Sequence, residues 1–150
     1  MRHPKLIIAG IGLATTTLLR TAYNAVSAAI YRHVAQAAGT GLRPAHGNAL
    51  EMLALQDGLR LTDIAAQAGM TTQSMGELVD DLAAKGYLRR QEDPADRRAK
   101  RIYLTGQGRQ AADAGEAATR TAEQQLQAAL GPRQYQQLRR NLAAIARLGP

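Results

Sequence analysis

The sequence predicts a mainly α-helical protein that contains a single β-hairpin. The chain of 150 residues is rich in alanine and has no Phe or Trp, a composition that favours closely packed helices over an extended sheet. Apolar residues recur at helical spacing along most of the chain, and the period changes to two only within residues 87–105. This length is typical of one domain, and we expect residues 1–150 to form one.

The first predicted helix covers about residues 5–38, or begins only at Leu18 after a short segment. Its apolar residues recur at helical spacing, and glycines end the pattern. The basic residues 1–5 and the apolar run after them also outline a secretory signal, although the uncharged run is too short to span a bilayer. Pro44 suits the first position of a second helix.

Two short helices close together form the next predicted unit. Thr62 is expected to cap a helix over residues 63–68, which ends at Gly69. Thr71 is expected to cap the following helix, which ends at Gly86. One face of that helix is apolar and should lie in the core, at Met75, Leu78, Val79 and Leu82. The pair is therefore predicted to be a helix–turn–helix.

A β-hairpin and two long helices complete the predicted chain. Residues 87–91 and 100–105 alternate like two strands, and the polar connection over residues 92–99 contains a turn proline. A long alanine-rich helix follows. The Gly131–Pro132 pair separates it from a last helix.

The predicted order is thus four helices, two strands and two further helices. A helix–turn–helix followed directly by a charged hairpin predicts a winged helix, in which the second helix enters the major groove of DNA and the hairpin follows the backbone or the minor groove. The formal net charge of +7 favours an anionic partner. Residues 85–109 hold eight basic and three acidic residues, whereas residues 49–84 hold one basic and six acidic residues. The positive charge is therefore expected on the hairpin.

Residues 61–88, which include the Lys85–Gly86 pair, resemble the DNA-binding core of the MarR family of transcriptional regulators. The hairpin also resembles the wing of that family, with Asp96-x-Arg98 followed by Leu104–Thr105. The resemblance implies a winged helix–turn–helix over about residues 42–108. It also implies dimerisation helices over about residues 5–38 and 106–148. The implied function is a ligand-responsive repressor that binds a pseudo-palindromic double-stranded DNA operator as a homodimer.

The polar residues at the start of the second helix of the pair are predicted to contact DNA: Thr71, Thr72, Gln73 and Ser74. Their backbone N–H groups suit phosphate, and their side chains suit base edges. Gln73 is the best candidate for reading adenine. Gly76 and Glu77 depart from the family pattern, because polar and basic residues often stand at these positions. Glu77 argues against strong phosphate binding by this helix.

The resemblance gives the wing residues separate roles. The aspartate at the position of Asp96 holds the shape of the wing in the family, and the arginine at the position of Arg98 reaches the minor groove. An ordinary surface ion pair between the two side chains is the alternative. Arg97, Lys100 and Arg101 either contact phosphates or remain solvated.

Members of the family often bind small, frequently aromatic or phenolic effectors in a cleft between the dimerisation helices and the winged helix. Tyr23, His33 and His46 are the candidates to line such a cleft. The alternative is that these three side chains are simply packed or solvated.

The sequence argues against other chemistries. The absence of cysteine excludes disulfides, thiolate metal sites and thiol catalysis. The three histidines lack metal-ligand spacing, and no serine lies in a Gly-x-Ser-x-Gly motif. We therefore expect no catalytic residues, no metal, no cofactor, no membrane partner and a cytoplasmic location. A winged helix that binds another protein instead of DNA is the competing hypothesis, favoured by the acidic second helix and opposed by the basic wing.

Overall fold

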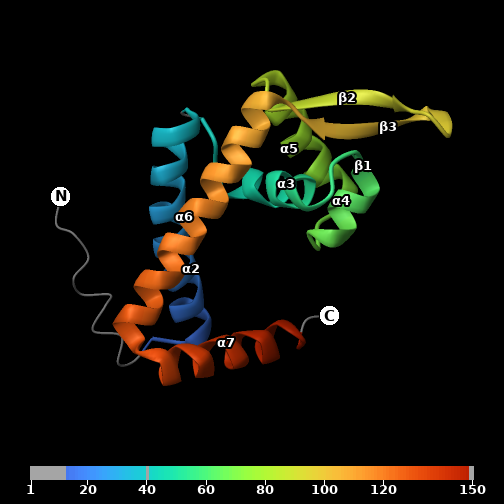
Figure 1. The fold of residues 1–150 in the computed structure, drawn as a ribbon. Helices are drawn as coiled ribbons and strands as arrows, with labels where there is room; N and C mark the ends of the chain where they lie inside the picture. The colour runs from blue at the N-terminus through green and yellow to red at the C-terminus, as the bar shows by residue number, and fades with distance from the viewer. Residues whose placement is uncertain (1–12, 40, 149–150) are drawn as a thin grey trace.

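The computed structural model describes residues 13–39 and 41–148 and confirms the mainly helical fold (Figure 1). The elements in chain order are α2 (Thr15–Ala38), α3 (Pro44–Leu55), β1 (Leu59–Arg60), α4 (Leu61–Gln67), α5 (Thr72–Ala84), β2 (Leu88–Asp93), β3 (Asp96–Leu104), α6 (Gly106–Leu130) and α7 (Pro132–Ala146). The predicted stretch before Leu13 lies outside the described residues. Within them, no helix is long and apolar enough to cross a membrane.

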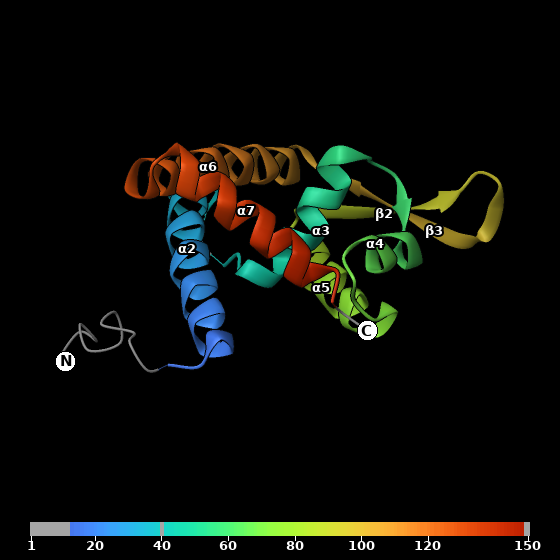
Figure 2. The same ribbon diagram turned by 90° about the horizontal axis from the view of Figure 1, so that it is seen from below.

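The winged helix consists of α3, α4, α5 and a three-stranded antiparallel sheet with strand order β1-β3-β2. Its core is a single cluster of buried apolar side chains that includes Leu53, Ile64, Met75, Val79 and Leu82. The apolar face predicted for the second helix of the pair is therefore confirmed. Figures 1 and 2 both show the β2–β3 hairpin extending away from the helices, which leaves its far end free to contact another molecule.

The predicted start of the first helix of the pair is wrong by two residues. Helix α4 begins at Leu61, Arg60 is its N-cap, and no side chain caps it, so Thr62 lies inside the helix. The reason is strand β1, which the sequence did not reveal. Arg60 pairs with Arg101 of β3, and this pairing holds its backbone extended immediately before the helix. The cap predicted for α5 is confirmed, because the Thr71 side chain accepts a hydrogen bond from the backbone N–H of Ser74 at 3.1 Å.

The hairpin is longer than predicted. Most of the connection expected over residues 92–99 is strand, and only residues 94–95 form the turn. Asp93 pairs with Asp96 across the hairpin, with an irregularity in register beside Glu92. The Asp93 carboxylate accepts a hydrogen bond from the backbone N–H of Ala95 at 3.0 Å, so the side chain itself closes the turn.

Helices α2 and α6 pack against one another beside the winged helix. Small side chains permit this contact, since Ala118 and Ala122 of α6 are buried. Tyr87, which lies between α5 and β2, joins α2 to the winged helix. Its hydroxyl donates a hydrogen bond to the backbone carbonyl of Ala38, the last residue of α2, at 3.1 Å. Gly108 of α6 lies so close to the carbonyl of Tyr87 that a Cβ there would come within 2.0 Å of the oxygen.

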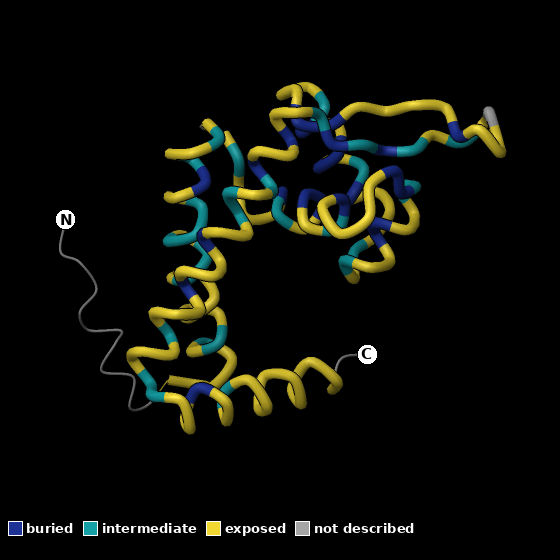
Figure 3. Tube along the Cα trace, in the orientation of Figure 1, coloured by how far each residue is buried: buried dark blue, intermediate teal, exposed yellow. Residues whose placement is uncertain are grey.

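Helix α7 leaves the end of α6 at a sharp angle (Figures 1 and 2). Within the described residues, its only extensive contact is with α6. Tyr135 is its one buried residue, whereas Leu142 and Ile145 are 41% and 43% exposed. Figure 3 shows the contrast between this exposed helix and the buried residues of the winged helix. No other part of the chain that the structure describes therefore covers the apolar ridge on α7.

Candidate nucleic-acid interface

The recognition helix α5 is fixed by its apolar side, so that its polar side faces outward. Met75 and Val79 are fully buried in the core, whereas Gln73 and Glu77 are exposed. All four residues predicted to contact DNA at its start, Thr71, Thr72, Gln73 and Ser74, are exposed. Two of them bind each other, because the Thr71 hydroxyl donates to Ser74 Oγ at 2.9 Å. Thr72 and Gln73 thus remain available for a partner.

Asp96 and Arg98 lie together at the tip of the wing, but not as an ion pair between side chains. Asp96 Oδ1 accepts a hydrogen bond from the backbone N–H of Arg98 at 3.0 Å. The carboxylate therefore fixes the backbone that carries Arg98, while the Arg98 side chain stays exposed. The side chain of Arg97 lies outside the described parts of the structure.

Asp93 is the wing residue that the sequence did not reveal. Its carboxylate is fully buried and accepts hydrogen bonds from Nε and Nη2 of Arg60 at 2.8 and 2.7 Å. Nε of Arg101 lies 3.1 Å away. The hydrogen bond from the Ala95 backbone, together with the two guanidinium groups, lowers the pKa of Asp93 to about 2. An acid beside a turn proline gave no sign of this role, because both arginines reach it only through the pairing of β1 and β2 with β3.

Five of the eight basic residues in the wing region, residues 85–109, form ion pairs with carboxylates of the chain itself. The pairs are Lys85–Asp81, Arg90–Asp80, Lys100–Glu92, Arg101–Asp93 and Arg109–Asp57. Arg89 lies instead over the ring of Tyr103, 4.8 Å from its centroid. No carboxylate of the described residues pairs with Arg98 or Arg89, so the unpaired positive charge lies at the tip of the wing and beside Tyr103.

The three residues suggested for an effector cleft do not share one environment. Tyr23 is 62% exposed on α2, and the exposed His33 bonds through Nδ1 to the Ala29 carbonyl at 2.9 Å. His46 is fully buried. Its Nδ1 accepts from the Arg43 backbone N–H at 3.0 Å, and its Nε2 lies 2.8 Å from an Asp81 carboxylate oxygen. The structure therefore places His46 in the packed alternative, and an effector role for Tyr23 and His33 stays a prediction.

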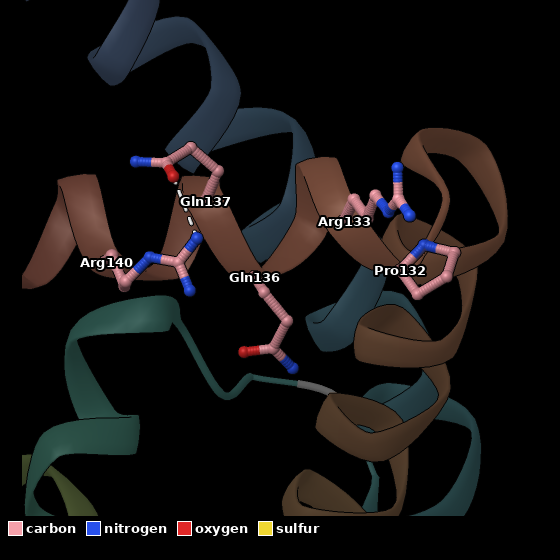
Figure 4. A pocket seen from close by; sticks show the side chains of 5 residues that line it. All are labelled: Pro132, Arg133, Gln136, Gln137 and Arg140. Atoms are coloured by element: carbon pink, nitrogen blue, oxygen red, sulfur yellow. Dashed lines mark hydrogen bonds between the residues drawn. The ribbon is translucent and has the colours of Figure 1, made fainter.

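Two surface hollows are lined by other residues. An open hollow of about 530 Å³ lies along the first turns of α7, where Arg140 donates to Gln137 at 2.8 Å (Figure 4). A smaller one of about 250 Å³ lies between α2 and α6 and is lined by Ala25, Val26, Ala29, Ala122, Gln125 and Leu126. Among the described residues, no group of acidic or histidine side chains could hold a metal ion.

A recognition helix with an exposed polar side, followed by a wing that ends in a fixed arginine, defines a winged helix–turn–helix protein. Residues 40–99 match the model of the MarR family, and no curated protein sequence matches the chain. Over these residues the chain carries a winged helix of the MarR family.

Three solved structures illustrate the likeness. A probable transcriptional regulator from Pseudomonas aeruginosa is 27% identical, with a TM-score of 0.73 over 87% of this chain and 96% of that one. The transcriptional repressor CouR, solved on a 23-mer DNA duplex, is 26% identical, with a TM-score of 0.75 over 97% and 98%. MepR of S. aureus, solved in complex with DNA, is 24% identical, with a TM-score of 0.79 over 91% and 99%.

Proposed function

We propose that this chain is a ligand-responsive transcriptional repressor that binds a pseudo-palindromic double-stranded DNA operator as a homodimer. Each subunit would place α5 in a major groove and the wing tip in the adjacent minor groove. Two such subunits require half-sites about 34 Å apart, centre to centre. The DNA-bound structures of CouR and MepR support DNA as the partner of this fold.

The state of Arg98 is the observation that carries the proposal. Its side chain is exposed, and Asp96 fixes the backbone that presents it. A narrow minor groove has an enhanced negative potential that attracts guanidinium groups. A wing that served only to bind a neutral protein surface would gain nothing from an arginine held in this way. The arrangement therefore favours DNA over the protein-binding alternative.

The exposed ridge on α7 supports the homodimer. Leu142 and Ile145 together with the neighbouring Leu148 present apolar area to solvent, and burying such area is favourable by about 25 cal/mol per Å². A second copy of the chain offers the same ridge and the exposed apolar residues of α2. Effector binding would then act by favouring one geometry of the dimer over another, with Tyr23 and His33 on α2 as the candidate contacts.

Selection of bound sequences from a random DNA pool tests the proposal directly. The purified wild-type protein should enrich an inverted repeat, and a salt titration on the selected duplex should show affinity falling as salt rises. Enrichment of no sequence, together with binding that is insensitive to salt, would favour the protein-binding alternative.

A further inference from the structure

Glu77 stands unpaired on the outward side of the recognition helix. It is exposed, and no hydrogen bond or ion pair joins its carboxylate to any other described residue. The residues three and four positions away on α5 are Gln73, Ser74, Asp80 and Asp81, none of them basic. Its two acidic neighbours are compensated, because Asp80 pairs with Arg90 at 2.7 Å and Asp81 pairs with Lys85. Among the side chains that the structure describes, this one carboxylate of the outward side of α5 is thus left uncompensated.

Gly76 leaves space beside Glu77 that the packing of the protein does not require. A Cβ at Gly76 would meet only Leu61, 3.6 Å from Cδ2, which is ordinary van der Waals contact. A glycine inside a helix costs about 1 kcal/mol relative to alanine. Since alanine would fit, packing among the described residues does not require the glycine. A missing side chain on this side allows a partner to approach the backbone of α5 closely.

The chemistry of the major groove limits what such a carboxylate can meet. Phosphates repel it, and the acceptor atoms of guanine and thymine offer it no hydrogen. Adenine presents its N6 donor beside the N7 acceptor, a pair that suits an amide better than a carboxylate. The N4 amino group of cytosine donates a hydrogen bond into the groove and is the group that glutamate and aspartate accept from. We propose, on the basis of the proposed function, that Glu77 reads a cytosine and that Gly76 provides the clearance for this contact.

The position of Glu77 relative to Gln73 adds a geometric consequence. The two residues are four apart on α5, about 6 Å along the helix axis. That distance is close to two base-pair steps of about 3.4 Å each. With Gln73 reading adenine, each half-site should show an adenine and a cytosine preference about two base pairs apart.

The experiment is sequence selection from a random DNA pool with full-length wild type, Glu77→Gln and Glu77→Ala, followed by binding to duplexes that differ at the selected cytosine. Glu77→Gln should change that preference to adenine, since glutamine pairs with adenine. Glu77→Ala should lose the preference, with a fall in discrimination on the order of tenfold. Glu51→Gln, an exposed residue on α3 that undergoes the same change of charge, is the control and should select the wild-type sequence.

Two results would overturn the inference while leaving DNA binding intact. The first is an unchanged consensus for both Glu77 variants with tighter binding to all duplexes alike, which would make the carboxylate merely repulsive. The second is a Gly76→Ala variant that binds DNA as tightly as the wild type, because no close approach would then exist. If the wild type itself selects no sequence, the proposed function fails, and this inference fails with it.

Discussion

Arg98 is exposed at the tip of the wing, so its removal should affect DNA binding without affecting folding. We expect Arg98→Ala to weaken binding to the selected operator by about 1–3 kcal/mol. Fluorescence anisotropy at moderate salt measures the binding, and the Tm should equal that of the wild type. Because Asp96 acts by holding the Arg98 backbone, Asp96→Ala and Arg98→Ala should be less than additive in the double variant. Wild-type affinity for Arg98→Ala would contradict the minor-groove role.

His46 links the start of α3 to the recognition helix and should make the fold sensitive to acid. Burial lowers the pKa of His46 below its ordinary value, although Asp81 opposes this effect. Protonation would also place a hydrogen on Nδ1, which now accepts from the Arg43 N–H. A folded-state pKa below the unfolded value means that stability is fully present above about pH 6.5 and is lost as the pH falls below it.

Thermal unfolding measured between about pH 7.5 and about pH 5 tests this effect. The matched variant is His46→Gln, because glutamine at the third position of a helix can accept from the N-cap N–H without titrating. Its Tm should fall less over this range than that of the wild type. Equal slopes for the two proteins would show that His46 does not cause the acid sensitivity.

At the scale of single elements, the wing depends on two aspartates with different tasks. Asp93 joins β2 to β1 and β3 through Arg60 and Arg101, whereas Asp96 acts only at the tip. Asp93→Asn should therefore lower both the Tm and DNA affinity, since it leaves two guanidinium groups side by side without a counter-charge. Asp96→Ala should lower affinity alone. A Tm unchanged by Asp93→Asn would show that these ion pairs do not stabilise the sheet.

The low pKa of Asp93 means that its ion pairs with Arg60 and Arg101 can also be tested by unfolding in acid. Its folded-state pKa of about 2 lies below the ordinary value of 3.8. The stabilisation is therefore present above pH 3.8 and is lost as the pH falls from 3.8 toward about 2. Acid unfolding followed by circular dichroism should show this loss in the wild type and not in Asp93→Asn.

The features that the sequence predicted correctly depend on neighbours along the chain. The Thr71 cap and the apolar face of α5 involve residues within a few positions of each other, where helical periodicity is informative. Strand β1 has only two residues, and its pairing with β3 joins positions about 40 apart in the chain. The roles of Asp93 and His46 were missed for the same reason. Asp93 meets Arg60, and His46 meets Asp81, only after distant segments have been brought together.

At the scale of the whole molecule, the exposed ridge on α7 allows a test of assembly that should leave the fold of the monomer intact. The exposure of Leu142 in one copy means that a charge there should not disturb the fold of the monomer. Leu142→Glu should therefore give a folded monomer at micromolar concentration in sedimentation, where the wild type should give a dimer. Gln136→Glu, exposed elsewhere on α7, should remain dimeric. A dimeric Leu142→Glu protein would place the interface elsewhere.

The internal neutralisation of the wing region has a consequence for how the protein would search a genome. Binding to arbitrary DNA comes almost entirely from phosphates neutralised by free basic groups and from the counterions that they release. Five of the wing-region bases already have carboxylate partners, so few counterions should be released at each site. The logarithm of affinity should then fall with the logarithm of salt concentration, but less steeply than eight free bases in each subunit would give. A regulator of this kind would spend little time on the vast excess of competing sites, and its occupancy of an operator would depend chiefly on the bases read by α5.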